Sequence, residues 1–353
     1  MSQSEQSDAV RHLRGIDLTL RASAVGVLLL TALWVLRDIL LLGFAAVLLA
    51  CVLRGAGDSV HRRTGVGQGW ALTIVVLAIS ITIGALLWWR GAAIGEQTTR
   101  MLEQLTSQLE RLWQQLGASE WGSLVSEQLR GAVKSLGALT SYVPGVAGSV
   151  LGIGGSLIVV LASGLFLAVS PHLYLSGALR LLPIAWRPRG REVAVEIGTT
   201  LRLWCLGQLF DMVIVSTLVG IGLFLLGVPL APTLALFAGL LNFVPYVGAL
   251  AGAAPAILVA LSQSPTQALW VGLLFVGVQA LEGNIIAPLI QKRTVSLPPA
   301  LTLLSQTILG TLLGVIGLVL ATPLTAALLT AVRMTYVESV LERDIEDEPG
   351  DDA

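Results

Sequence analysis

Residues 231–261 read APTLALFAGLLNFVPYVGALAGAAPAILVAL and carry no charged side chain. A straight helix needs only about 20 apolar residues to cross the roughly 30 Å hydrocarbon core of a bilayer, so the stretch is too long for one crossing. Asn242, Pro245 and Gly248 interrupt it near its middle. Broken backbone at membrane depth is tolerated only where protein shields it or where it lines a wet cavity. The stretch therefore predicts two half-depth arms, a re-entrant hairpin.

A second long apolar stretch, 300–332, has the same character. It is interrupted by three glycines and a proline: Gly310, Gly314, Gly317 and Pro323. If 231–261 enters and returns on the outer side, 266–288 crosses inward and the basic pair Lys292–Arg293 lies inside, where Lys and Arg of short loops accumulate. The second stretch then enters and returns on the inner side.

The units 203–262 and 266–333 would each contain a span followed by a hairpin, in opposite orientations. Inverted repeats with broken helices that meet at the bilayer midplane recur among secondary transporters. A bundle of eight plain spans is the alternative.

Composition places the whole chain in the membrane class. Of its 353 residues, 55% are hydrophobic and 12% charged, about half the charged share of a soluble domain. The apolar runs do not alternate in polarity as barrel strands do. We predict an all-α polytopic protein with about eight membrane-embedded helical segments, two of them re-entrant hairpins that form an inverted repeat.

The net charge is −1, so the chain has no overall positive charge that would attract nucleic acid. The two cysteines, Cys51 and Cys205, lie in apolar runs and are interpreted as packing residues. The polar N-terminus is followed by many apolar runs, so a cleaved signal peptide is not expected.

Basic residues in short loops set the expected orientation. The Arg37–Asp38 pair is predicted to form a tight outer turn between the first two spans, and both chain termini are placed in the cytoplasm. The predicted regions are a cytoplasmic tail (1–21), three transmembrane helices (22–90), an extracytoplasmic amphipathic segment (91–148), a transmembrane helix with a basic cytoplasmic loop (149–202), a transport core with two broken helices (203–333) and an acidic cytoplasmic tail (334–353).

The amphipathic segment 91–148 alternates charged residues with leucines at helical spacing. It is interpreted as a cap or an oligomer contact, or as a helix that borders the substrate path. Gly148 and Gly152, four residues apart, predict close helix packing.

Polar side chains inside apolar runs are costly, so each is a functional candidate. The cluster Gln279, Glu282 and Asn284 lies near the end of a span, and Glu282 follows about 15 largely apolar residues. Burial disfavours a charged carboxyl, so Glu282 could exchange protons in a coupled cycle. Alternatively it caps a hairpin or pairs with Lys292 or Arg293.

Two further polar groups have open interpretations. Asp211 could belong to the site or make a structural contact with Arg202 or Gln208. Asn242, beside Pro245 and Tyr246, marks the presumed hairpin tip, where freed backbone groups can bind an ion or a polar solute, or else it caps a packed kink.

Enzyme motifs are absent from the sequence. The three histidines fall in polar flanks, and neither an HExxH helix nor a Gly-x-Ser-x-Gly pattern occurs. The glycines between 145 and 155 follow no strand, which argues against a dinucleotide site. We expect no catalytic role, no cofactor and no metal site.

Three segments together resemble the autoinducer-2 exporter family of permeases. They are LNFVPYVG (241–248), EGNIIAP (282–288) followed by a basic pair and VSLP (295–298), and the glycines at 310, 314 and 317 followed by ATPL (321–324). The resemblance covers roughly residues 10–340. It departs at VSPHLY (169–174), where the family often has an acidic residue, and at KRT (292–294), where it usually has Gly-Arg-Ser.

The resemblance implies a bacterial inner-membrane protein that forms a homo-oligomer, with a pentamer suggested. Family members are described as exporters of autoinducer-2, and some as sodium or lithium/proton antiporters. The family motifs, matched to this sequence, imply that the site residues are Asn242, Pro245, Tyr246, Gly248, Glu282, Asn284 and Pro288.

We predict a secondary active transporter that exports a small polar solute, coupled to an ion gradient. The alternatives are a sodium or lithium/proton antiporter, a passive channel and a non-transporting envelope scaffold. The expected partners are the lipid bilayer, a small polar solute or monovalent cation, and further copies of the chain. The predicted pathway residues are Asp211, Asn242, Pro245, Tyr246, Gly248, Gln279, Glu282 and Asn284, and the predicted packing glycines are Gly148, Gly152, Gly252, Gly310, Gly314 and Gly317.

Overall fold

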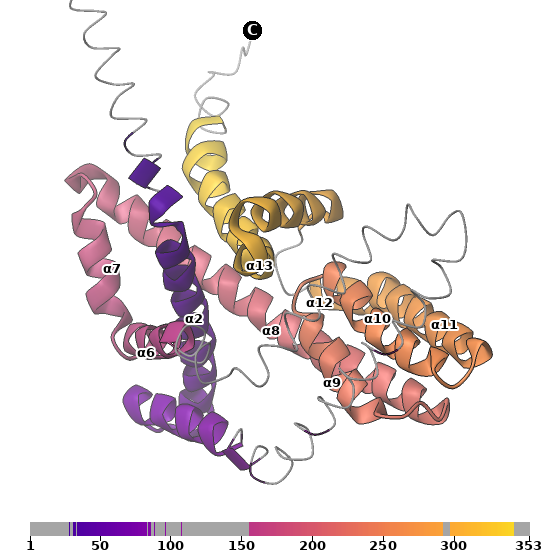
Figure 1. The fold of residues 1–353 in the computed structure, drawn as a ribbon. Coiled ribbons are helices and arrows are strands. Elements are labelled where there is room, and N and C mark those ends of the chain that lie inside the picture. Colours follow the sequence, from indigo (N-terminus) through magenta and orange to yellow (C-terminus); the bar gives the residue numbers. More distant parts are fainter. Residues whose placement is uncertain are drawn as a thin grey trace, which may run out of the picture.

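A computed structural model describes residues 34–82, 155–291 and 297–341 and a few isolated positions between 28 and 107. Every regular element in these ranges is helical (Figure 1). In chain order the labelled elements are α2 (Arg37–Thr64), α6 (Gly155–Val169), α7 (Pro171–Arg180), η2 (Ile184–Trp186), α8 (Arg187–Leu225), α9 (Ala231–Leu241), α10 (Val247–Leu261), α11 (Pro265–Leu281), η3 (Glu282–Ile286), α12 (Ala287–Gln291), α13 (Pro299–Val332) and η4 (Arg333–Leu341). A further helix, Gln68–Thr82, follows α2.

Four helical segments in the described ranges are long and apolar enough to cross a membrane. They are Arg37–Thr64, Ile184–Leu225, Pro265–Ile290 and Pro299–Val337. The pair α6 and α7, bent by 91° at Ser170, makes a fifth if it counts as one broken span. Shorter apolar helices cover Gln68–Thr82, Ala231–Leu241 and Val247–Leu261.

The surface of these helices is apolar. Large side chains such as Phe224, Leu225 and Leu250 are each about three-quarters exposed, and at most 39% of the residues in any of the four apolar windows are buried inside the protein. Soluble monomers rarely expose such extensive apolar surface. A lipid environment accounts for it.

Helix α8 connects the two halves of the fold. It contacts α2, α9, α11 and α13 and runs obliquely between α2 and α9 (Figure 1). Its C-terminal part, including Val219 and Leu223, belongs to a buried core with α9, α10 and α11. Nearer its middle, Leu201 and Trp204 pack in a second core with α2 and α13.

The N-terminal part differs from the sequence prediction in one respect. Arg37 and Asp38 lie in the first turn of α2, and helical hydrogen bonds of 2.9 Å join Leu36 to Ala32 and Leu40 to Leu36. The predicted tight turn at Arg37–Asp38 is therefore wrong, because both residues are helical and belong to α2.

The predicted basic loop after the fourth span is also largely helical. Arg187 begins α8, which continues without a break through Arg202 to Leu225. The basic residues therefore do not form a loop. They make up the N-terminal part of α8, which is longer than one membrane crossing requires.

The stretch 231–261 folds into two antiparallel helices, α9 and α10, joined by a turn at 242–246. The arms pack closely enough that a Cβ at Gly252 would lie 2.9 Å from the Cα of Ala238. At Gly248, next to the turn, a Cβ would lie 1.9 Å from the carbonyl oxygen of Leu241. Only glycine permits this approach of the two backbones.

The stretch 300–332 is likewise broken. Gly314 has φ 67° and ψ −154° inside α13, a combination that essentially only glycine adopts. On either side, Gln306 donates a hydrogen bond to Thr322, and a Cβ at Gly310 would meet Leu318. These pairs are centred on Gly314, so the two parts of α13 fold back on each other as a second hairpin (Figure 1).

The tail 1–21, nearly all of the amphipathic segment 91–148 with Gly148 and Gly152, and the basic pair Lys292–Arg293 lie outside the described residues. The predicted roles of these segments stay predictions.

Candidate functional site

One face of α8 presents three side chains toward the two hairpins. Trp204, Gln208 and Asp211 are spaced four and three residues apart, which places them on one side of a helix. Asp211 is 7% exposed. An acidic side chain is thus buried within a helix apolar enough to span a membrane.

The tip of the first hairpin supplies Asn242. It is the C-cap residue of α9 and is completely buried. Gln208 of α8 donates a hydrogen bond of 2.7 Å to its backbone carbonyl. This bond satisfies an end-of-helix oxygen that would otherwise be unpaired, and it ties the hairpin tip to α8.

The chain then reverses through a strained turn at Tyr246. This residue has φ 64° and ψ −55°, and the N–H of Val247 donates to the carbonyl of Pro245 at 2.7 Å. Such a γ-turn is rare for a residue with a side chain. Backbone strain of this kind concentrates at functional sites.

Glu282 marks the end of α11 and the start of the π-helical turn η3. Single π-helical turns within α-helices occur frequently at functional sites. Gln279, three residues earlier, donates a hydrogen bond of 2.7 Å to Oε2 of Glu282. The carboxylate is partly exposed.

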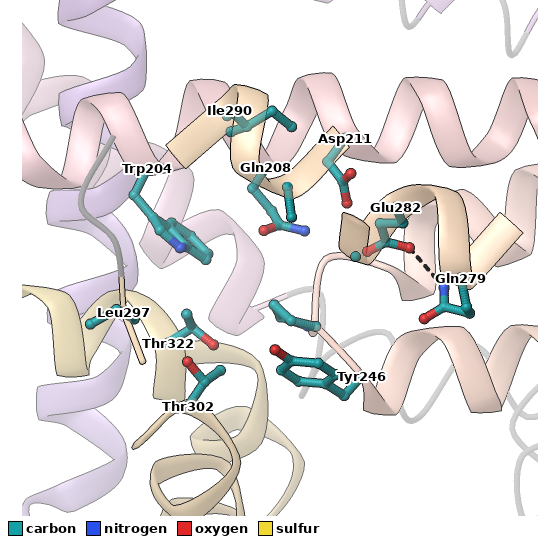
Figure 2. A pocket seen from close by; sticks show the side chains of 14 residues that line it. Trp204, Gln208, Asp211, Tyr246, Gln279, Glu282, Ile290, Leu297, Thr302 and Thr322 are labelled. Atoms are coloured by element: carbon teal, nitrogen blue, oxygen red, sulfur yellow. Dashed lines mark hydrogen bonds between the residues drawn. The ribbon is translucent and has the colours of Figure 1, made fainter. Parts of the chain in front are cut away.

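These elements bring two carboxylates and one amide together. Asn242 Nδ2 donates to Asp211 Oδ2 at 2.7 Å and to Glu282 Oε1 at 3.3 Å. The three residues come from α8, from the tip of the first hairpin and from the end of α11. We call them the carboxylate–amide cluster. Figure 2 shows the Asp211 side chain pointing toward Glu282.

The cluster contains more acceptors than donors. Asp211 Oδ1 and Asn242 Oδ1 are buried and have no hydrogen-bond partner. In the described part of the chain, neither carboxylate forms an ion pair with a basic side chain. Buried acceptors without partners are unfavourable, so the geometry suits a proton or a cation.

A cavity of about 200 Å³ opens beside the cluster. Asp211, Gln279 and Glu282 line it together with Pro245 and Tyr246 of the hairpin tip. Trp204 forms part of its wall and packs edge-on against Phe243, with ring centroids 5.7 Å apart.

The second hairpin reaches the same cavity. Thr302 and Thr322, one from each arm of α13, belong to its lining and approach from the opposite side in the view of Figure 2. Both broken helices therefore border one polar cavity.

Three of the predicted pathway residues do not line the cavity: Asn242 is buried behind Asp211 and Glu282, and Gly248 and Asn284 lie apart from it. Gly248 is buried where the hairpin arms approach each other. Asn284 is exposed, and its side chain donates to the carbonyl of Ala280. The structural partner considered for Asp211 is also different, since Arg202 donates to Gly55 of α2.

Sequence reasoning did not select Trp204, Gln208, Thr302 or Thr322 as site residues. For the first two there was a signal, because they precede Asp211 at helical spacing on one face. Threonines in apolar helices commonly bond to their own backbone, so Thr302 carried no distinguishing pattern. Thr322 belongs to the ATPL motif (321–324), which was the signal that could have found it.

Apolar helices that expose their surface, interrupted by two hairpins around a buried polar cluster, define a multi-pass membrane protein. The family model described as AI-2E family transporter matches residues 24–336. The chain belongs to this family of transporters.

Several relatives, each provisionally named a transport protein, are similar to part of the chain. YueF of Bacillus subtilis is 34% identical over 156 residues, which are 44% of this chain and 41% of that protein. YrrI of the same organism is 34% identical over 148 residues, 42% of each. YhhT of Escherichia coli K12 is 32% identical over 158 residues, 44% of this chain and 41% of that protein. The chain therefore spans about two fifths of the length of these relatives.

Proposed function

We propose that this protein is a secondary active transporter in which the carboxylate–amide cluster binds the coupling cation and the adjacent cavity binds a small polar solute. The coupling cation is a proton or a monovalent metal ion. The observation that carries the proposal is the pair of buried acceptor oxygens, on Asp211 and Asn242, that have no partner.

The arrangement of charges in the cluster favours a bound cation. Two carboxylates share a single amide donor, Asn242 Nδ2. Like charges this close disfavour the doubly ionised state in a low-dielectric site. A bound proton or cation removes that repulsion and satisfies the free oxygens. Its release restores the repulsion, which gives the cluster two states of different charge.

The cavity size restricts the solute. At about 200 Å³ it is smaller than the roughly 300–1,000 Å³ of sites for drug-sized ligands. Its lining mixes carboxylates, amides and hydroxyls with the rings of Trp204 and Tyr246. Both features agree with a small polar solute, and the family resemblance makes an autoinducer-2-like molecule the first one to test.

The proposal places both hairpins within the membrane as re-entrant elements. α9 has 11 residues and α10 has 15, which correspond to about 16 Å and 22 Å of helix at 1.5 Å per residue. Each arm is shorter than the roughly 30 Å hydrocarbon core. The element order, a long helix and then a hairpin, occurs in α8–α10 and again in α11–α13, as an inverted repeat would require.

With this topology both termini lie in the cytoplasm, and the family resemblance implies that the membrane is the bacterial inner membrane. Cysteine accessibility tests it in a variant without Cys51 and Cys205. A cysteine at Gln263 should be labelled from outside and one at Ser296 from inside. The opposite labelling would refute the hairpin topology.

A homo-oligomer is also part of the proposal. The glycines Gly252, Gly310 and Gly317 meet side chains or backbone of their own hairpins, and Gly314 forms the break in α13. The Gly148–Gly152 pair is therefore the candidate for contacts between subunits. Native mass spectrometry in detergent should show a single symmetric species, and a pentamer is expected from the resemblance. A monomer at all protein concentrations would refute this part.

The transport proposal is tested by flux in proteoliposomes with an imposed proton or sodium gradient and a panel of labelled small polar solutes. Glu282→Gln removes one charge of the cluster and should abolish gradient-driven flux. Glu196→Gln makes the same change at an exposed position of α8 and should leave flux unchanged. Equal flux in the two variants would refute the role of the cluster.

The alternatives predict other outcomes. A sodium or lithium/proton antiporter shows cation exchange without any solute from the panel. A passive channel shows unitary conductance and flux that does not depend on the gradient. An envelope scaffold shows no flux.

A further inference from the structure

The second hairpin carries a buried polar pair that the proposed cation site does not use. Gln306 lies on the first arm of α13 and Thr322 on the second, and they are 2% and 4% exposed. Gln306 Nε2 donates to the hydroxyl oxygen of Thr322 at 3.3 Å. Gln306 Oε1 is buried and has no partner.

This bond determines what Thr322 offers to the cavity. A hydroxyl has one hydrogen to donate and two lone pairs to accept with. Because the oxygen of Thr322 accepts from Gln306, its hydrogen is available for a molecule in the cavity that Thr322 lines. Thr322 therefore presents a donor on a wall opposite the acceptor-rich cluster (Figure 2).

Thr302, on the same wall, behaves differently. Its hydroxyl donates to the carbonyl of Pro298 at 3.4 Å, which leaves oxygen lone pairs for the cavity. The wall formed by the second hairpin thus combines one donor with one acceptor, a pattern that matches a hydroxyl or carbonyl group of a solute.

The charges of the side chains that line the cavity disfavour an anionic solute group. The described residues that line the cavity include two carboxylates, Asp211 and Glu282, and no basic side chain. A carboxylate or phosphate at Thr322 would face these negative charges across a cavity of about 200 Å³, and a single monovalent cation bound at the cluster would neutralise only one of them.

We propose that Thr322 is the residue that donates a hydrogen bond to the solute, that Gln306 positions it, and that the solute group bound there is an uncharged oxygen acceptor. This inference deepens the proposed function and rests on the same cavity. It assigns solute recognition to the second hairpin and cation binding to the cluster at the first.

The test is a charge series of thiol reagents on Thr322→Cys in a background in which Cys51 and Cys205 are replaced by alanine. The probes are methanethiosulfonates that carry hydroxyethyl, trimethylammonium-ethyl or sulfonatoethyl groups, which are neutral, cationic and anionic. Rates are divided by those of Gln263→Cys, an exposed position outside the cavity. The neutral and cationic reagents should react, and the anionic one should react at least about tenfold more slowly.

Two variants make the result specific. Adding Glu282→Gln should restore reaction with the anionic reagent, because one of the two repelling charges is gone. Thr325→Cys, buried on the same arm with its hydroxyl bonded to Ala321, is the matched control and should not react. If Thr322→Cys alters folding, Thr302→Cys probes the same wall and should show the same charge order.

The role of Gln306 has its own readout. A donor to the sulfur stabilises a thiolate, which is the reactive form. Gln306→Leu should therefore slow labelling of the introduced thiol about threefold to tenfold at pH 7.5, which is the effect expected from the loss of one hydrogen bond. The labelling rate at pH 10 should be unchanged. A uniform change at both pH values would indicate a structural role and overturn the positioning assignment.

Equal normalised rates for the three reagents, or no reaction at either threonine position, would overturn the proposal for Thr322. Labelling needs neither a gradient nor transport. A charge-selective result without coupled flux would therefore refute the proposed function alone.

Discussion

Asn242→Leu is the perturbation that most sharply separates the carboxylate–amide cluster from an ordinary polar contact. Leucine is similar to asparagine in size but cannot donate to Asp211 and Glu282. A hydrogen bond to a charged group contributes about 1.5–3 kcal/mol. Two are lost, and the 3.3 Å bond to Glu282 counts at the lower end. We expect a loss of about 3–5 kcal/mol in the free energy of unfolding, measured by titration with SDS in mixed micelles.

Most of that loss should come from two carboxylates that face each other without the shared amide: Asp211 loses its donor, and Glu282 keeps only the bond from Gln279. Adding Asp211→Asn removes one of these charges and restores an amide beside Glu282. The double variant should therefore lose less free energy of unfolding than the two single variants lose together. The difference should be at least about 2 kcal/mol, as expected for groups in one network.

Asn284→Leu makes the same chemical change at an exposed amide and serves as the control, with an expected change within about 0.5 kcal/mol. Strict additivity of Asn242→Leu and Asp211→Asn would refute the reasoning, because it would mean that the amide does not hold the two carboxylates together.

Three further predictions follow from the hairpins and the site. Gly248→Ala should destabilise the protein by more than about 3 kcal/mol in the same titration, because a Cβ would overlap the carbonyl of Leu241 and the hairpin arms would have to separate. The control is Gly272→Ala, which has open space around it and should change stability by less than about 1 kcal/mol. Gly314→Ala should lower the free energy of unfolding by about 1–3 kcal/mol through backbone strain alone, because nothing lies within 4 Å of the added carbon. An unchanged unfolding midpoint would contradict the break in α13. Asn284→Leu should retain gradient-driven flux within about twofold of wild type, because its side chain lies away from the cavity; loss of flux would move the site toward that residue.

The sequence was sufficient to predict the helical class and both interruptions in the long apolar stretches. Residue counts decide these features: more than 30 apolar residues cannot form one straight crossing, and proline or clustered glycines mark where the backbone bends. The meeting of Asp211, Asn242 and Glu282 was not predictable in detail. These residues are 31 and 40 positions apart, and only the packing of α8 against both the first hairpin and α11 brings them together.

Other parts of the prediction failed for local reasons. A charged pair such as Arg37–Asp38 indicates a turn on average, yet charged residues are also common in the first turn of a helix, where α2 places them. The sequence offered Arg202 or Gln208 as a structural partner of Asp211, but Arg202 donates to Gly55 of α2 and Gln208 to the carbonyl of Asn242. The observed partner of Asp211 is the Asn242 side chain. Helical spacing alone does not contain that information.

The central claim is that Asp211 and Glu282 together bind the cation that drives transport. The most direct measurement is the decay of an imposed proton or sodium gradient across proteoliposomes, with a solute that the wild-type protein carries, for wild type and for Asp211→Asn combined with Glu282→Gln. Wild type should dissipate the gradient in step with solute movement. The double variant, folded and inserted to the same extent, should do neither. Gradient decay and solute movement at wild-type rates in the double variant would contradict the central claim.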